Sequence, residues 1–169
     1  MRFFIPKRLK RKIIKKYYLQ KSISRIGSYK SLPHINKKSK FSKNTHLGNN
    51  CHFNGIEVNG DGRVVIGDNF HSGPECLIIS QNHNINGKSL PYDNTYITKN
   101  VIIEDNVWLG SRVIILGGVT IGEGAVIQAG SVVVSDIPPL AIAGGHPAVV
   151  FSERNKEHYY KLKEEKSFH

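Results

Sequence analysis

An aliphatic residue recurs at every sixth position between residues 101 and 134. This period matches neither the 3.6-residue repeat of a helix nor the two-residue alternation of a half-buried strand. It is typical of a triangular solenoid, in which each six-residue unit forms one flat face and points its aliphatic side chain to the axis. Such units bury their apolar sides only against their neighbours, so they must come as an array. The aliphatic residues are Ile103, Leu109, Ile115, Ile121, Ile127 and Val133.

A second series of residues supports the solenoid. Four positions after each of the first five aliphatic residues stands a small or β-branched residue, and Gly, Asn and Asp gather where the backbone must turn. Earlier fragments keep the pattern, so we expect the solenoid to occupy residues 44–151. The period breaks after residue 79, and the polar segment 84–100 is expected to project from one corner as an inserted loop, often on the binding face. The second series is Val107, Val113, Val119, Ala125 and Ser131.

The basic character of the chain belongs to its N-terminal part. Residues 1–43 hold 15 of the 24 Lys and Arg residues and no Asp or Glu. Residues 44–169 hold 9 Lys and Arg against 13 Asp and Glu, a net charge of −4. A uniformly basic surface would favour nucleic acid. This split instead predicts an acidic domain with a cationic leader and no nucleic-acid partner.

Residues 1–21 predict a basic amphipathic helix. Leu9, Ile13 and Tyr17 follow one another at a spacing of four, and lysines and arginines surround them. This helix can pack on the body of the protein or on a neighbouring subunit, or it can lie on an anionic membrane surface. The pattern leaves both alternatives open, packing on protein and contact with a membrane.

The flanking segments are expected to be short. Residues 22–43 are rich in Ser and Lys and predict a connector, so 1–43 form one N-terminal unit. Residues 152–169 predict a C-terminal helix that caps the open end of the solenoid. No run of apolar residues is long enough for a transmembrane helix. We therefore expect a cytoplasmic protein, with contact at the inner face of the membrane as an additional expectation.

The repeat, the phrase "NVWLGSRVIILGGVTIGEGAVIQAGSVV" and the exit "AGGHPA" together resemble the hexapeptide-repeat acyltransferases. The resemblance covers about residues 44–151 and is strongest to the galactoside, maltose and polysaccharide O-acetyltransferase branch. It implies an all-β fold, a left-handed parallel β-helix, here with a basic N-terminal helix and a short C-terminal helix. It also implies acetyl-CoA as the co-substrate, no metal, and a homotrimer with its clefts between neighbouring β-helices.

The resemblance also suggests which residues carry the activity. His83, at the root of the inserted loop, corresponds to the catalytic histidine of the family. Asn54 corresponds to a residue that contacts the acceptor sugar, and Trp108 to one that borders the cleft. Tyr92, in the inserted loop, is expected to meet the apolar face of a sugar ring.

A second group of residues is expected along the co-substrate. The family has basic residues facing the CoA phosphates where this chain has Ser135 and Val149, so Arg154 and Lys156 are the candidates to replace them. The residues expected beside the pantetheine arm are Gly110, Ser111, Ala129 and Gly130.

One histidine is enough for the expected chemistry. A sugar hydroxyl needs a general base, and an imidazole with an ordinary pKa of about 6.5 is neutral at pH 7 and can pass the proton on to the leaving thiolate. A backbone N–H on a coil edge could stabilise the oxyanion. Glu75 and a backbone carbonyl are both candidates to orient His83. We expect direct transfer without an acyl-enzyme.

The most specific interpretation is transfer of acetyl to a sugar hydroxyl in cell-surface polysaccharide biosynthesis. The acceptor would be a sugar, a nucleotide-sugar or a lipid-linked saccharide. The alternatives are N-acetylation of an amino-sugar nucleotide, a metal-dependent hydratase and a non-catalytic solenoid. His46, His52 and His71 could approach one another across coils, but the His-x4-His pair of the zinc-dependent hydratases is absent, so no metal is expected.

Overall fold

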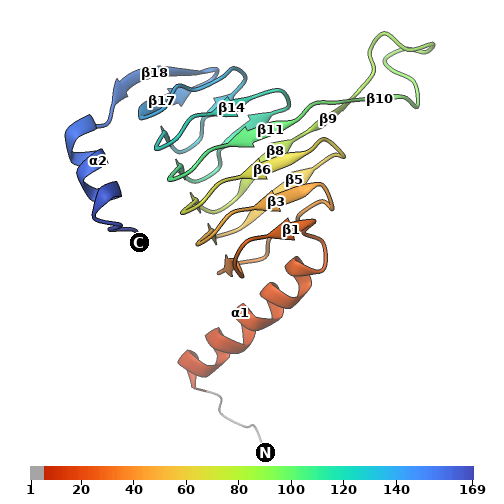
Figure 1. The fold of residues 1–169 in the computed structure, drawn as a ribbon. Coiled ribbons are helices and arrows are strands. Elements are labelled where there is room, and N and C mark those ends of the chain that lie inside the picture. The colour runs from red at the N-terminus through yellow and green to blue at the C-terminus, as the bar shows by residue number, and fades with distance from the viewer. Residues whose placement is uncertain (1–5) are drawn as a thin grey trace, which may run out of the picture.

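The computed structural model describes residues 6–169 and shows a three-sided prism of stacked coils with a helix joined to each end (Figure 1). About six coils follow one another along the prism. Each side of the prism is a sheet in which the equivalent strands of successive coils lie on one another. The predicted solenoid is therefore confirmed.

Each coil passes through three sheets in the order A, B, C, so the prism has an A–B, a B–C and a C–A corner. All their strand pairs are parallel except β17 with β18. Sheet A consists of β1 (Ser28–Tyr29), β3 (Thr45–Leu47), β6 (Val64–Ile66), β11 (Val101–Ile103) and β14 (Thr120–Ile121). Sheet B consists of β2 (His34–Ile35), β4 (His52–Phe53), β7 (His71–Ser72), β12 (Trp108–Leu109), β15 (Val126–Ile127), β17 (Ala141–Gly145) and β18 (Ala148–Glu153). Sheet C consists of β5 (Ile56–Asn59), β8 (Cys76–Ile79), β13 (Ile114–Leu116) and β16 (Val132–Val133).

The sixfold repeat forms the core along the prism axis. All six aliphatic residues of the period are fully buried, and the second series is buried beside them. In sheet A, for example, the register places Ile103 between Ile66 and Ile121. Burial of each such side chain contributes about 1.5–3 kcal/mol. The stacked aliphatic columns thus hold each coil on its neighbours.

Asparagines form a ladder along the A–B corner. Asn50, Asn69 and Asn106 have φ values of 51°, 56° and 60°, a left-handed conformation that asparagine tolerates. The Asn50 side-chain amide donates to Asn69 Oδ1 over 3.0 Å, and that of Asn69 donates to Asn106 Oδ1 over 2.9 Å. The ladder therefore satisfies polar groups at the turns and keeps the coils in register.

The predicted connector over residues 22–43 is wrong for most of its length. Strand β1 pairs with β3, β2 pairs with β4, and Lys40 forms a bridge with Glu57, so a first complete coil precedes residue 44. Ile35 and Phe41 are buried and close the end of the core. They also stand six positions apart, but the aromatic residue and the surrounding lysines conceal the aliphatic period.

Helix α1 (Lys7–Ile23) extends from the base of the prism (Figure 1). It covers most of the predicted segment 1–21, of which residues 1–5 lie outside the described part of the chain. Only its last turns contact the coils, where Ser22 Oγ donates to the Ser39 carbonyl over 3.0 Å. No helix within residues 6–169 is long and apolar enough to cross a membrane.

Helix α2 (Lys156–Glu164) lies along the A–B corner rather than over the open end of the prism, so the predicted cap is wrong (Figure 1). The Asn155 side chain caps its first turn by accepting from the His158 N–H. Tyr159 is the buried residue of the helix, and its hydroxyl accepts a hydrogen bond from Asn106 over 2.9 Å. A polar contact at the end of the asparagine ladder therefore decides where α2 lies.

Candidate active site

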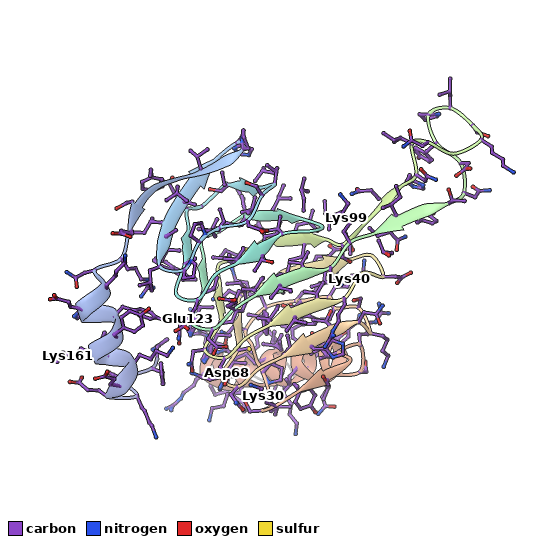
Figure 2. The ribbon with its side chains drawn as sticks, turned by 45° about the horizontal axis from the view of Figure 1, so that its top comes forward. Lys30, Lys40, Asp68, Lys99, Glu123 and Lys161 are labelled. Carbon is purple, nitrogen blue, oxygen red and sulfur yellow. The ribbon has the colours of Figure 1, made fainter. Side chains whose placement is uncertain are left out.

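The inserted segment leaves the prism at the C–A corner as a two-stranded arm (Figures 1 and 2). Strand β9 (Gln81–His83) pairs in antiparallel fashion with β10 (Tyr96–Thr98), and residues 84–95 form the loop between them. The predicted insertion at 84–100 therefore contains one loop and one strand of the arm. His83 ends β9 and lies opposite Tyr96.

His83 lies among aromatic rings. Its imidazole stacks on Tyr92 with ring centres 3.8 Å apart and planes at 16°, and it contacts the Tyr96 ring at 4.6 Å and 36°. Its Nδ1 is buried and has no hydrogen-bond partner within residues 6–169. Glu75, one of the candidates to orient this ring, instead accepts a 2.7 Å hydrogen bond from Arg112 at the B–C corner.

Asp93 organises the loop that carries Tyr92. Its carboxylate accepts the Lys88 N–H over 2.8 Å, the Thr95 N–H over 2.9 Å and the Thr95 hydroxyl over 2.5 Å. These hydrogen bonds, that of the Thr95 hydroxyl foremost, hold the pKa of Asp93 below its usual range. The loop therefore has a defined shape next to the histidine.

The residues expected along the co-substrate lie together at the B–C corner. Gly110 and Ser111 end one coil face there, Ala129 and Gly130 end the next, and the Gly130 N–H donates to the Ser111 carbonyl over 2.8 Å. A Cβ on Gly110 would lie 2.5 Å from the Ala129 nitrogen, so close coil stacking alone requires this glycine. Gly130 has a φ of +75°, and a Cβ there would face open space.

Asn54 lies at the same corner, nearer the base of the prism. Its side-chain amide donates to the Ser72 carbonyl over 2.9 Å, and its Oδ1 accepts from the Asn36 amide over 3.1 Å. Both polar groups of the side chain are thus used between coils. These contacts give the asparagine a structural role, and its contact with an acceptor sugar stays a prediction.

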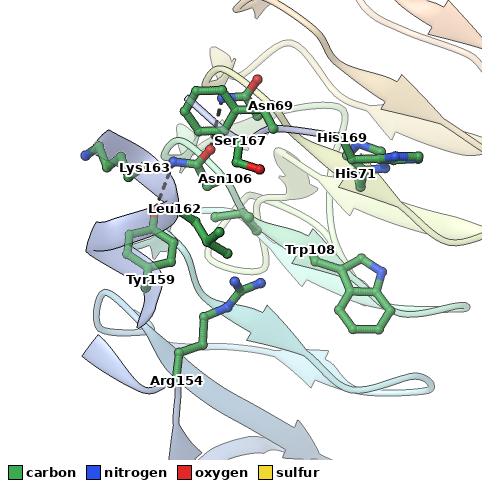
Figure 3. A pocket seen from close by; sticks show the side chains of 12 residues that line it. Asn69, His71, Asn106, Trp108, Arg154, Tyr159, Leu162, Lys163, Ser167 and His169 are labelled. Atoms are coloured by element: carbon green, nitrogen blue, oxygen red, sulfur yellow. Dashed lines mark hydrogen bonds between the residues drawn. The ribbon is translucent and has the colours of Figure 1, made fainter. Parts of the chain in front are cut away.

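Trp108 lies on the outer face of sheet B and exposes 53% of its surface. The register places it between His71 and Val126. Its ring borders a pocket of about 370 Å³ between sheet B and the C-terminal segment (Figure 3). The pocket is lined by Asn69, His71, Asn106, Val107, Trp108, Arg154, Tyr159, Leu162, Lys163, Ser167, Phe168 and His169.

Arg154 and Lys156 have different environments. The Arg154 guanidinium points into the pocket of Figure 3 and lies 5.6 Å from the centre of the Tyr159 ring. Across the described chain no carboxylate lies within 4 Å of it. Lys156 is exposed and lies 3.7 Å from Glu153. Arg154 is therefore the better placed of the two cations to meet a ligand anion in this pocket.

Three histidines stack on sheet B below Trp108. The ring centres of His34 and His52 are 4.1 Å apart, and those of His52 and His71 are 4.3 Å apart. Burial, with the neighbouring imidazoles, lowers the pKa of His52 to about 4, and burial also lowers the pKa of His71. Within residues 6–169 no group of three or more His, Cys, Asp or Glu side chains is arranged to hold a metal ion.

Most of the expected site residues therefore fall into three groups. His83 and Tyr92 lie on the arm at the C–A corner, the small residues lie at the B–C corner, and Trp108 lies with Arg154 beside sheet B. One chain does not bring these groups together. Sequence reasoning missed the contribution of α2 to the pocket, although the repeated asparagines before β4, β7 and β12 mark the corner where it lies.

A model of the bacterial transferase hexapeptide family, six repeats long, matches residues 100–135. A maltose O-acetyltransferase from Clostridium difficile 630 is 32% identical with a TM-score of 0.62, over 76% of this chain and 66% of that chain. A hexapeptide-repeat acetyltransferase from Vibrio cholerae, solved with acetyl-CoA, is 26% identical with a TM-score of 0.61, over 79% of this chain and 74% of that one. A galactoside acetyltransferase with coenzyme A is 26% identical with a TM-score of 0.62, over 90% and 82%.

The chain thus spans just under two thirds of the length of the Clostridium relative and more of the other two. None of the curated proteins matches it. These relatives share the left-handed parallel β-helix, which confirms the predicted fold class. Two of them were solved with acetyl-CoA or coenzyme A bound.

Proposed function

Because the chain belongs to the hexapeptide-repeat acyltransferase family, we propose that it transfers acetyl from acetyl-CoA to a sugar hydroxyl. The acceptor belongs to cell-surface polysaccharide biosynthesis, as a nucleotide-linked, lipid-linked or oligomeric sugar. Support comes from the projecting arm, where a histidine lies beside two tyrosine rings. The polar side chains of the loop around them suit the hydroxyl groups of a sugar.

The separation of the site residues is the observation that carries this proposal. His83 lies at the C–A corner. Ser111 and Ala129 lie on each other in successive coils at the B–C corner of the same prism, and we call this pair the column. When three prisms pack around a threefold axis, one corner of each copy faces a different corner of the next. The active site is therefore built between two copies in a homotrimer, with His83 from one and the column from its neighbour.

The B–C corner fits a slender, extended co-substrate. Ala129 is exposed, and the α-carbon of Gly130 faces open space, so no side chain obstructs the column. Acetyl-CoA supplies the thioester that is attacked. Arg154, with no carboxylate partner among residues 6–169, supplies a cation for its phosphates, the role expected where Ser135 and Val149 are not basic.

His83 acts as the general base. It removes the proton of the acceptor hydroxyl as that oxygen bonds to the acetyl carbon, and it returns the proton to the sulfur as the carbon–sulfur bond breaks. The products are an acetyl ester and free CoA, and no covalent acyl-enzyme forms. The same base would serve a sugar amine, so N-acetylation is the second outcome that an acceptor screen must separate.

We also propose that α1 holds the enzyme at the inner surface of the membrane. Leu9, Ile13 and Tyr17 expose 49%, 53% and 58% of their surface, and no acidic residue lies in the helix. None of its lysines or arginines forms an ion pair within the described residues. An apolar stripe with free cations around it is complementary to an anionic lipid surface.

Complementation between two inactive variants tests the composite site. His83→Ala removes the base from one corner, and Ala129→Trp obstructs the column at the other. Each homotrimer should be inactive, whereas trimers reassembled from a mixture contain some interfaces with both intact corners and should recover activity. If the mixture stays inactive although mixed trimers are found by mass spectrometry, the composite site is wrong.

The acceptor is tested separately by following release of the CoA thiol. Wild-type enzyme is given acetyl-CoA with sugar nucleotides, amino-sugar nucleotides or oligosaccharides, and product treatment with mild base distinguishes an ester from an amide. A base-labile product supports O-acetylation. A base-stable product supports the N-acetylation alternative and overturns the hydroxyl acceptor.

A further inference from the structure

We propose that Tyr92 and Tyr96 hold the His83 imidazole by ring contact, and that Asp93 is a positioning residue that keeps Tyr92 in place. The proposal rests on the proposed function, in which His83 is the general base. It changes the role of Tyr92, since the ring expected to meet the sugar is already engaged with the histidine. It also assigns a role to a carboxylate that the reaction itself does not use.

The two tyrosines approach the imidazole from different sides. Tyr92 is nearly parallel to the ring of His83, with centres 3.8 Å apart, and Tyr96 is tilted by 36° at 4.6 Å. No contact between the two tyrosine rings exists in the part of the chain that the structure describes. If they shared one face of so small a ring they would touch, so the imidazole lies between them.

This ring contact replaces a usual means of orienting a catalytic histidine. A hydrogen bond to the second ring nitrogen normally sets the direction of the first. His83 Nδ1 is buried and has no hydrogen-bond partner in residues 6–169. Glu75, a candidate to orient the ring, instead accepts a hydrogen bond from Arg112. Tyrosine faces also favour the imidazolium that forms as the base accepts its proton.

The two tyrosines are themselves held in different ways. Tyr96 is fixed by the ladder of β9 and β10, in which it pairs with His83. Tyr92 lies in a loop and has no strand partner, but the next residue, Asp93, accepts three hydrogen bonds at 2.5–2.9 Å from Lys88 and Thr95. Both carboxylate oxygens of Asp93 accept hydrogen bonds, and the two donor residues, Lys88 and Thr95, belong to the arm. The arm therefore forms its own support for Tyr92.

The tests compare steady-state kinetics of variants of the full-length protein, with acetyl-CoA and the acceptor that the screen identifies. Tyr92→Leu removes the stacked face, and Tyr92→Phe keeps it while losing the hydroxyl. Asp93→Ala removes all three hydrogen bonds. Ser89→Ala, an exposed residue in the same loop, is the matched control.

A positioning role predicts that kcat falls while both KM values stay near those of the wild type. Misplacing a catalytic group by about 1 Å costs roughly a hundredfold in rate, so we expect Tyr92→Leu and Asp93→Ala to lose about ten- to hundredfold in kcat. Tyr92→Phe should restore most of the loss, and Ser89→Ala should match the wild type. Asp93→Ala in a His83→Ala background should cause no further loss, because residues that act as a unit are not additive.

The outcomes separate this inference from the function on which it rests. Full activity of His83→Ala overturns the proposed base and this inference with it. If His83→Ala is inactive but Tyr92→Leu and Asp93→Ala keep the wild-type kcat, only the positioning role is wrong. A rise in the acceptor KM with unchanged kcat in Tyr92→Leu would instead mean that Tyr92 binds the sugar. Melting temperatures of all variants show whether any loss comes from unfolding.

Discussion

The Tyr159 hydroxyl donates a hydrogen bond to Glu123 Oε1 over 2.7 Å and so joins α2 to the A–B corner of the prism. The same carboxylate oxygen accepts from Lys163. Burial alone would raise the pKa of Glu123, but the hydrogen bonds from Lys163 and Tyr159 hold it below its usual range. Gly124 leaves the space that the Tyr159 ring occupies, since a Cβ there would lie 2.8 Å from it. One buried phenol thus fixes the wall of the pocket in Figure 3.

Tyr159→Phe should lower the free energy of unfolding by about 1–3 kcal/mol, because it leaves two partly buried polar groups without their partner. These groups are the Glu123 carboxylate and the Asn106 amide. Urea unfolding followed by circular dichroism measures the loss. Tyr160→Phe is the matched control, since Tyr160 exposes 49% of its surface and should be neutral. A loss as large in the control would contradict the assigned hydrogen bonds.

His83→Ala should lower kcat by roughly 10²–10⁴-fold through loss of general base catalysis. The side chain is not part of the buried core, so the melting temperature and the oligomer should stay those of the wild type. Release of the CoA thiol measures the rate, and light scattering measures the mass. His158→Ala, an exposed histidine in the first turn of α2, should keep full activity.

Replacing Lys10, Arg11 and Lys15 by Gln should weaken binding to vesicles rich in phosphatidylserine by roughly a hundredfold, at about 1 kcal/mol for each cation near the surface. Sedimentation with the vesicles measures the bound fraction. The control replaces three lysines outside α1, at positions 99, 161 and 166, and should bind as the wild type does. Equal binding of both variants would show that α1 is not the membrane contact.

The stacked histidines on sheet B should make the fold sensitive to mild acid. The folded-state pKa of His52 is lowered to about 4 by burial and by its neighbours His71, His34, His169 and Lys15. Below an unfolded-state pKa of about 6.5 the unfolded chain binds a proton there and the folded chain does not, so stability falls as the pH drops from about 6.5 toward 4.

Replacing the titrating ring with one that cannot bind a proton should remove part of this dependence. His52→Phe keeps an aromatic ring in the stack and should retain about 1 kcal/mol more of its stability than the wild type on going from pH 7 to pH 5, since solvent screens a partly exposed group. Urea unfolding at the two pH values measures the difference. An identical pH dependence in the variant would mean that His52 does not contribute.

Much of this protein could be predicted from the period of six. Ile103 and its successors lie on the axis, and the break after residue 79 is where the arm leaves the prism. The same period at Ile35 and Phe41 marks the first coil, but Phe in place of an aliphatic residue concealed it. His83 is predicted as the catalytic residue from its place at that break and from the resemblance to the family, and neither argument uses its surroundings.

The sequence by itself determined the coil, because every coil repeats one short-range geometry and each aliphatic side chain stacks on the equivalent residue of the next coil, as Ile103 does on Ile121. Only the tertiary structure decided which corner carries each candidate site residue and what each one touches. The stacking of Tyr92 on His83 depends on the shape of a loop, and the position of α2 depends on the contact of Tyr159 with Glu123, 36 residues away. Such contacts have no period, since a single hydrogen bond or ring contact between distant residues establishes each of them.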